Sequence, residues 1–293
     1  MHERPKLTRD KPMAHASPAG DWVSIRRDAE TGIETIRAHF KGHAYDPHDH
    51  DDVLVGITEQ GVQEFRCRRR LHTSTPGRVI LIEPGEVHDG HSPRDEGFTY
   101  AMLYLPARLL AARADALRDL GGTSGAIGFR DTLSDDPRLA AAIHGAFLAV
   151  HGAEGRLARD LGLDALAARL AGHVLAPGTA RPRVPGPAAA RARDALHARM
   201  AEDVGLDELA ALAGVDRFRL NRVFRAAFGQ SPHAYLVRLR LKAARRLLAA
   251  GEAPAAAAAE VGFADQSHLG RWFRRAYGMT PAAYRRICTN VPD

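Results

Sequence analysis

Apolar residues in the first third of the chain occur in short runs bounded by Gly, Pro and Asp. The clearest runs are at 53–57, 79–82 and 98–105. Runs of this length predict short buried strands. Many short strands separated by Gly and Pro turns are typical of a small barrel or jelly roll. We therefore expect a β-rich domain that ends near residue 106.

Helical spacing follows in three segments, at 107–120, 136–152 and 155–176, which are rich in Ala, Leu and Arg. We expect this helical region to pair two copies of the chain. A stretch with four Pro and two Gly then predicts an interdomain linker at 177–187. Residues 188–288 have a helical pattern almost throughout.

The last hundred residues contain an internal repeat with an offset of 49. The sequence GQSPHAY, which begins at Gly229, recurs as GMTPAAY from Gly278. In each copy we interpret Gly as the end of one helix, Ser or Thr as the N-cap of the next, and Pro as its first residue.

Upstream of these caps, each copy predicts a helix-turn-helix unit. A short helix carries a small Ala, a Gly allows a sharp turn, and an Asp caps a second helix held on the core by apolar residues at i and i+4. The residues in these roles are Ala210, Gly214, Asp216, Leu220 and Phe224 in the first copy and Ala258, Gly262, Asp265, Leu269 and Phe273 in the second.

The opposite face of each second helix is polar. Arg can donate twice to guanine, and Asn or Gln can pair twice with adenine, so this face is suited to reading bases in duplex DNA. The polar residues are Arg217, Asn221, Arg222 and Arg225 in the first copy and Gln266, Ser267, His268 and Arg271 in the second.

The net charge of +6 is unevenly distributed. Residues 187–293 hold 17 Lys and Arg against 10 Asp and Glu, whereas residues 1–186 hold 24 against 25. A basic C-terminal third is typical of a domain that binds a polyanion. The helix expected at about 232–250 joins the two units and would be about 28 Å long, close to the roughly 34 Å between successive major-groove segments on one face of DNA. Its cations are Arg238, Arg240, Lys242, Arg245 and Arg246.

The string VGFADQSHLGRWF at 261–273, followed by GMTPAAYR at 278–285, closely resembles the signature of the second unit of the AraC/XylS family of transcription regulators. The resemblance covers about residues 190–288. The chain departs from the family at Ala257, where Ile is usual, and at Gly270, which has no side chain to specify a base. Together with Arg225 of the polar face, the positions that the resemblance implies for DNA binding are Phe218, Asn221, Arg222, Gln266, Ser267, His268, Gly270 and Arg271.

The N-terminal half is similar to the cupin-like effector domain of that family. Residues 42–50, GHAYDPHDH, resemble the first cupin motif, and Gly77, Pro84, Gly85 and His88 resemble the second. We expect His48, His50 and His88 to line an effector pocket, with His48 and His50 on one side of a strand because they are two residues apart. A three-His metal site is an alternative, but the Glu of metal cupins is missing here. Another alternative is that these histidines are surface groups or stabilise a turn beside Asp49, Asp51 and Asp52.

These features predict an α+β multidomain protein: a cupin-like β-barrel with following helices, and an all-α domain of two helix-turn-helix units joined by a long helix. The expected segments are a flexible arm at 1–20, an effector domain at 21–106, a helical, dimerisation region at 107–176, the linker at 177–187 and an AraC-type DNA-binding domain at 188–288.

We expect a sequence-specific transcription regulator, an activator, whose DNA binding responds to a small-molecule effector. The expected partners are double-stranded DNA, the effector, a second copy of the chain and RNA polymerase, with no membrane, no cofactor and no enzymatic activity, in the cytoplasm. The alternative is a metal-dependent cupin enzyme fused to a DNA-binding domain. A repair methyl-acceptor is disfavoured because Cys67 and Cys288 alone cannot provide a cysteine-bound zinc.

Overall fold

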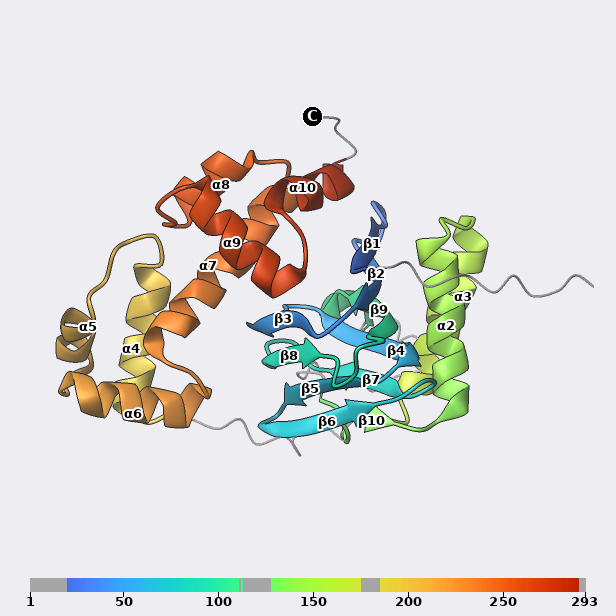
Figure 1. The fold of residues 1–293 in the computed structure, drawn as a ribbon, viewed down its shortest axis with the longest axis horizontal. Coiled ribbons are helices and arrows are strands. Elements are labelled where there is room, and N and C mark those ends of the chain that lie inside the picture. Colours follow the sequence, from blue (N-terminus) through green and yellow to red (C-terminus); the bar gives the residue numbers. More distant parts are fainter. Residues whose placement is uncertain (1–19, 111, 113–127, 175–184, 290–293) are drawn as a thin grey trace, which may run out of the picture.

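The computed structural model describes residues 20–110, 112, 128–174 and 185–289 (Figure 1). A β-rich N-terminal domain with two helices on one side is followed by an all-helical C-terminal domain. The α+β multidomain fold expected from the sequence is therefore confirmed. Residues 1–19 of the expected arm and residues 177–184 of the expected linker lie outside the described residues, and the last linker residue, Pro187, begins a helix.

The strands of the N-terminal domain form two antiparallel sheets. Among the described residues, the six-stranded sheet has the order β1-β2-β9-β4-β7-β10 and the four-stranded sheet has the order β3-β8-β5-β6. Their bounds are β1 (Trp22–Arg27), β2 (Glu34–Phe40), β3 (His43–His48), β4 (Val53–Gly61), β5 (Gln63–Cys67), β6 (Arg70–Ser74), β7 (Val79–Ile82), β8 (His88–His91), β9 (Phe98–Leu105) and β10 (Leu133–Ser134).

Two hydrophobic layers lie on the two faces of the six-stranded sheet. Phe40, Leu54 and Met102 point into the barrel, where they join residues of the smaller sheet. Val55 and Leu103 belong to the other layer, because neighbouring residues of a strand point to opposite faces. Helices α2 (Pro137–His151) and α3 (Arg156–Leu170) cover that outer face. Burial on both faces explains why these strands appear as continuous apolar runs in the sequence.

The helices expected at 136–152 and 155–176 are confirmed by α2 and α3. Of the segment expected at 107–120, residues 111 and 113–127 lie outside the described part of the chain. The side chain of Asp136 caps α2 by accepting hydrogen bonds from the backbone N–H groups of Arg138 and Leu139. Among the described residues, no helix is both long enough and apolar enough to cross a membrane.

The C-terminal domain begins at Pro187, one residue before the expected position. It has two hydrophobic cores, one for each helix-turn-helix unit, and α7 contributes Leu236 to the first and Val237 and Leu241 to the second. Its helices are α4 (Pro187–Ala198), α5 (Leu206–Ala213), α6 (Arg217–Phe228), α7 (Pro232–Ala249), α8 (Pro254–Glu260), α9 (Gln266–Tyr277) and α10 (Pro281–Thr289).

The turn of the second unit depends on Gly262. Its φ is +85°, and a Cβ placed there would lie 2.4 Å from the carbonyl oxygen of Ala201. Any larger residue would therefore both strain the turn and push it away from the loop that follows α4.

Candidate functional site

The second helix of each unit is built as the sequence predicts. Asp216 caps α6 by accepting hydrogen bonds from the backbone N–H groups of Phe218 and Arg219. Asp265 caps α9 by accepting a hydrogen bond from the backbone N–H group of His268. Both helices end at a glycine with left-handed φ, Gly229 and Gly278. The apolar anchors Leu220, Phe224, Leu269 and Phe273 have no exposed surface.

The outward face of α6 carries most of its predicted DNA contacts. Phe218 is 76% exposed, and the guanidinium of Arg217 lies 5.0 Å from the centre of its ring. Arg222 and Arg225 are exposed. Asn221 is half-buried, and its Oδ1 is buried without a hydrogen-bond partner among the described residues.

The outward face of α9 is similar but more polar. Gln266, Ser267 and Arg271 are exposed. The ring of His268 is held in place because its Nε2 accepts a hydrogen bond of 3.0 Å from Nε1 of Trp272. At Gly270 a Cβ would meet nothing within 4 Å, so a side chain there would not clash within the chain. The arginines and amides of both helices can donate to base edges and phosphates.

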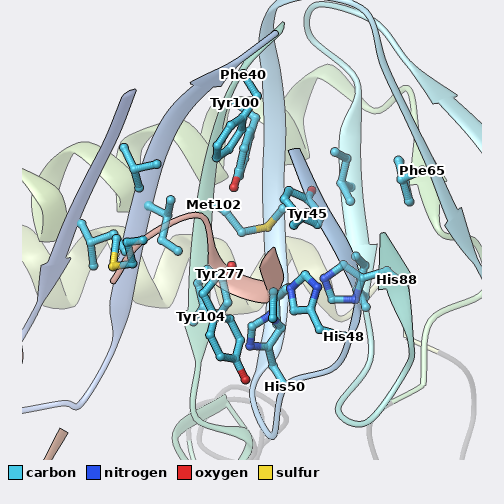
Figure 2. A pocket seen from close by; sticks show the side chains of 18 of the residues that line it. Phe40, Tyr45, His48, His50, Phe65, His88, Tyr100, Met102, Tyr104 and Tyr277 are labelled. Atoms are coloured by element: carbon cyan, nitrogen blue, oxygen red, sulfur yellow. The ribbon is translucent and has the colours of Figure 1, made fainter. Parts of the chain in front are cut away.

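The three histidines meet inside the barrel, where Figure 2 shows their rings beside Tyr104 and Tyr277. His48, His50 and His88 are all buried, and their candidate ligand atoms lie within 4.8 Å of one another. Burial therefore overturns the alternative in which these histidines are surface groups.

One part of this prediction is wrong: His48 and His50 do not share a strand. β3 ends at His48, and His50 lies in the loop that follows. Both rings nevertheless reach the same space, with centroids 4.8 Å apart.

Hydrogen bonds fix two of the imidazoles. Nδ1 of His48 donates to the carbonyl oxygen of Asp46 at 2.8 Å, and Nδ1 of His88 donates to that of Glu86 at 3.1 Å. Because a carbonyl can only accept, Nε2 of each ring is left as an acceptor. Burial, followed by the neighbouring imidazoles or arginines, lowers the pKa of His48 and His50 well below 6.5. The pocket therefore presents neutral imidazoles.

The mouth of the barrel is closed by the second helix-turn-helix unit. Arg245 of α7 pairs with Glu34 of β2 at 2.5 Å and contacts Nδ1 of His50 at 3.3 Å. The Tyr284 hydroxyl donates to the same Glu34 at 2.7 Å. The ring of Tyr277 lies 5.6 Å from that of His48 and 5.6 Å from the Arg245 guanidinium. The remaining cavity has a volume of about 30 Å³.

Two family models match this arrangement. The AraC-like ligand binding domain matches residues 30–171, and a helix-turn-helix domain matches residues 209–287. The chain belongs to the AraC family of transcription regulators. It thus combines an N-terminal ligand-binding domain with a C-terminal DNA-binding domain.

Individual relatives of this AraC-family chain agree with the family models. An uncharacterised HTH-type transcriptional regulator, YbfI of Bacillus subtilis (strain 168), is 25% identical over 249 residues, which cover 84% of this chain and 88% of YbfI. Two structures of ToxT from Vibrio cholerae strain SCE256 share the fold. An apo form of ToxT that carries a single lysine-to-alanine substitution has a TM-score of 0.54 and 12% identity, and the match covers 90% of this chain and 100% of that chain. Wild-type ToxT bound to an unsaturated fatty acid has a TM-score of 0.51 and 13% identity, and the match covers 94% of this chain and 98% of that chain.

Part of the basic helix α7 of this AraC-family regulator faces the barrel. Sequence reasoning missed this contact. Arg238 and Lys242 both bind Asp49, at 2.9 and 3.1 Å, and Lys242 also reaches Asp51 at 2.5 Å. These cations hold the DNA-binding domain against the barrel. The acidic run at 49–52 was the available signal, because it carries the opposite charge, but sequence alone did not pair the two segments.

The basic run Arg68–Arg69–Arg70 makes a further contact that sequence reasoning missed. Arg68 and Arg69 form a turn, with φ of 51° and 63°. Arg68 pairs with Glu83, and Arg69 donates a hydrogen bond of 2.9 Å to the carbonyl oxygen of Ala226 in α6. The turn is thus a second contact between the barrel and the DNA-binding domain.

Proposed function

We propose that this regulator reads two successive major-groove segments with α6 and α9, and that an effector inside the barrel controls this binding. One observation carries the proposal: the unit that presents Gln266 and Arg271 outward also closes the barrel with Tyr277 and Arg245. Any ligand that alters the closed mouth therefore acts directly on a DNA-reading unit.

Within this proposal the base-reading and phosphate-binding residues are those predicted from the sequence, with two refinements. Asn221 has to rotate before its buried Oδ1 can accept from a base. Gly270 contributes room rather than a hydrogen bond. α7 supports the two-groove arrangement because its 18 residues correspond to about 27 Å, near the pitch of the double helix.

The effector would shift the protein between DNA-binding states by binding one of them better. The structure of ToxT bound to an unsaturated fatty acid supports a small molecule as a ligand of this fold. In the present chain the closed cavity is much smaller than the roughly 300–1,000 Å³ usual for organic ligands. An organic effector would therefore have to displace the second unit from the mouth.

The test is a selection of duplexes from sheared genomic DNA and from a random library, using the full chain at several salt concentrations. We expect a consensus with two half-sites about one helical turn apart, and an affinity that falls as salt rises. If the protein prefers no duplex over random DNA at physiological ionic strength, the proposal is wrong.

We further propose that two copies pair through α2 and α3. Leu157 and Leu161, one helical turn apart on α3, are 74% and 62% exposed, and Leu148 of α2 is also exposed. A two-fold dimer would cover the same leucines on both copies. Sedimentation velocity should show a dimer that Leu161→Glu dissociates and Leu71→Glu, at an exposed leucine on β6, leaves intact. A monomeric wild-type chain at concentrations that bind DNA would exclude this pairing.

Two further parts of the proposal concern the outcome of DNA binding. We propose activation through contact with RNA polymerase, which an in vitro transcription assay on the selected promoter would show as an increase in transcript. We also propose that the barrel is not an active site, because its small closed cavity leaves little space for a substrate. A regulator of genomic DNA shares the compartment of that DNA, so a cytoplasmic location remains part of the proposal.

A further inference from the structure

The three buried histidines form a cluster whose chemistry differs from that of the rest of the barrel. Their ring centroids lie 4.8, 4.5 and 5.4 Å apart, and the walls around them are mostly apolar or aromatic. The group of potential ligands that the structure brings together here, among the described residues, consists of imidazoles alone. Imidazole sets favour Zn²⁺, Ni²⁺, Co²⁺ or Cu²⁺ over Mg²⁺ and Ca²⁺, which prefer oxygen ligands.

The hydrogen bonds of the cluster leave nitrogen lone pairs without partners. His48 and His88 each donate from Nδ1 to a backbone carbonyl, the bond that orients histidine ligands of metals and leaves Nε2 free to bind. Nε2 of His50 carries the proton of that ring, because Nδ1 accepts from Arg245, and it is buried without a hydrogen-bond partner among the described residues. A cation between the rings would bind the unpaired Nε2 lone pairs of His48 and His88, and that of His50 once its proton has moved to Nδ1.

The size of the cavity favours an ion over an organic ligand. About 30 Å³ is room for roughly two water molecules. A metal ion held by three imidazoles with a water as fourth ligand needs no more than this. The barrel can therefore accept an ion while Tyr277 and Tyr284 still close its mouth.

Metal binding at this cluster has a consequence for the DNA-binding domain through His50. Arg245 can only donate, so its 3.3 Å contact requires Nδ1 of His50 to be an acceptor. If the metal binds Nδ1, it replaces Arg245. If the metal binds Nε2, the proton of the neutral ring moves from Nε2 to Nδ1, and two donors then face each other. In both cases Arg245 loses this contact and lies close to a second positive charge.

We propose that His48, His50 and His88 bind one divalent transition-metal ion, and that the bound ion weakens the docking of α7 and the second helix-turn-helix unit on the barrel. The site itself stands on the geometry of the cluster. The link to DNA binding rests on the function proposed above, and it identifies the effector as an inorganic cation.

The first experiment measures binding of Co²⁺ and Zn²⁺ to the full chain after chelator treatment. We expect one equivalent by calorimetry, visible Co²⁺ absorption bands from nitrogen ligation, and at least a tenfold loss of affinity in each of the variants His48→Gln, His50→Gln and His88→Gln. His72→Gln, at a histidine stacked on Phe65 outside the cluster, is the matched control. Absence of a wild-type Co²⁺ spectrum, or equal binding by all four variants, overturns the site even if one variant fails to fold.

The second experiment measures hydrogen exchange in α7 and α10 with and without Zn²⁺. We expect saturating Zn²⁺ to speed up hydrogen exchange in the wild type and to leave the exchange rate of His88→Gln unchanged. Stoichiometric Zn²⁺ binding without any change in hydrogen exchange overturns the coupling between metal binding and domain docking, but it does not contradict the metal site itself. DNA affinity of the metal-free chain is measured in parallel, because failure to bind DNA there contradicts the proposed function and says nothing against the metal site.

Discussion

The two helix-turn-helix units share one sequence plan but have different surroundings. In the first unit, Phe228 and Tyr235 pack against each other inside their own core, with ring centroids 5.4 Å apart. The equivalent residues 49 positions later, Tyr277 and Tyr284, also pack on the core of their own unit, but in addition they line the cavity of the barrel. On the proposed function, one duplicated fold therefore reads DNA in both copies, and in one of them it also closes a pocket.

Few substitutions separate these two roles. A phenylalanine at the end of α6 corresponds to a tyrosine, Tyr277, at the end of α9. Ala226 of α6 corresponds to Arg275 of α9, which pairs with Asp46 of β3 at 2.6 Å. The buried anchors are unchanged in kind, since Leu220 and Phe224 match Leu269 and Phe273. The comparison shows that the core of a repeat fixes its fold, whereas a few rim residues determine what it contacts.

The largest expected effect comes from the two core phenylalanines. Phe224→Ala and Phe273→Ala should each lower the free energy of unfolding of their unit by about 3–5 kcal/mol, because each leaves a cavity. Phe273 also packs on Tyr277 and Tyr284, so its loss should loosen the barrel mouth as well. The other tryptophan, Trp272, lies in α9 beside Phe273, so both variants are made in a Trp272→Phe background. Denaturant unfolding followed by the fluorescence of Trp22 in the barrel then distinguishes the two variants. Equal effects on Trp22 would contradict the different roles of the units.

The next effect concerns the buried carboxylate that holds α7. Asp49→Asn leaves Arg238 without its charged partner, and we expect a loss near the lower end of about 3–5 kcal/mol because Lys242 retains Asp51. Hydrogen exchange should rise in β3 and α7. The exposed Asp207, which lies 3.7 Å from Arg217 in the first unit, provides the control Asp207→Asn. If Asp49→Asn and Asp207→Asn changed stability and hydrogen exchange to a similar extent, the docking of α7 on the barrel would contribute little to stability.

Equivalent arginines of the two recognition helices test whether both units read DNA. Arg222→Ala and Arg271→Ala should each weaken binding to the selected duplex by about 1–3 kcal/mol and relax the preference at one base pair. Fluorescence anisotropy on a set of single-base variants measures both quantities. Arg94→Ala, in an exposed loop of the barrel, controls for the loss of one charge. Losses that are equal on every sequence would assign these arginines to phosphates.

The smallest effect is the pH dependence of the first unit. The backbone N–H of Arg219, assisted by that of Phe218, lowers the pKa of the Asp216 cap below 3.8. A carboxylate with a lowered pKa in the folded state stabilises fully above 3.8, and this contribution disappears as the pH falls further. Thermal unfolding of the wild type should therefore lose stability below pH 3.8 relative to Asp216→Asn. If the stability of the wild type and of Asp216→Asn changed in parallel with pH, the Asp216 cap would not contribute to the pH dependence.

The sequence allowed the elements, the caps and the repeat to be predicted because these depend on neighbours in the chain. Asp216, Gly229 and Ser231 act within one helical turn, so their roles follow from spacing alone. The convergence of His88 on His48 was expected only through a resemblance.

The docking of the two domains could not be predicted in the same way. Arg245 and Glu34 are separated by 211 residues, and neither has a local pattern that indicates the other. The strand 34–40 gave no sign that its first residue would be a buried acid. His50 was misplaced because the strand ends two residues earlier, which the alternation of residues does not reveal.

One consequence of α7 concerns the architecture of the operator. The single helix α7 contributes to both cores, with Leu236 in the first and Leu241 in the second. The distance between α6 and α9 therefore cannot change unless one of these leucines leaves its core. Inserting one base pair between the half-sites rotates one relative to the other by about a tenth of a turn. This regulator should therefore be strict about spacer length, and promoters that differ in spacing by a single nucleotide would belong to different control circuits.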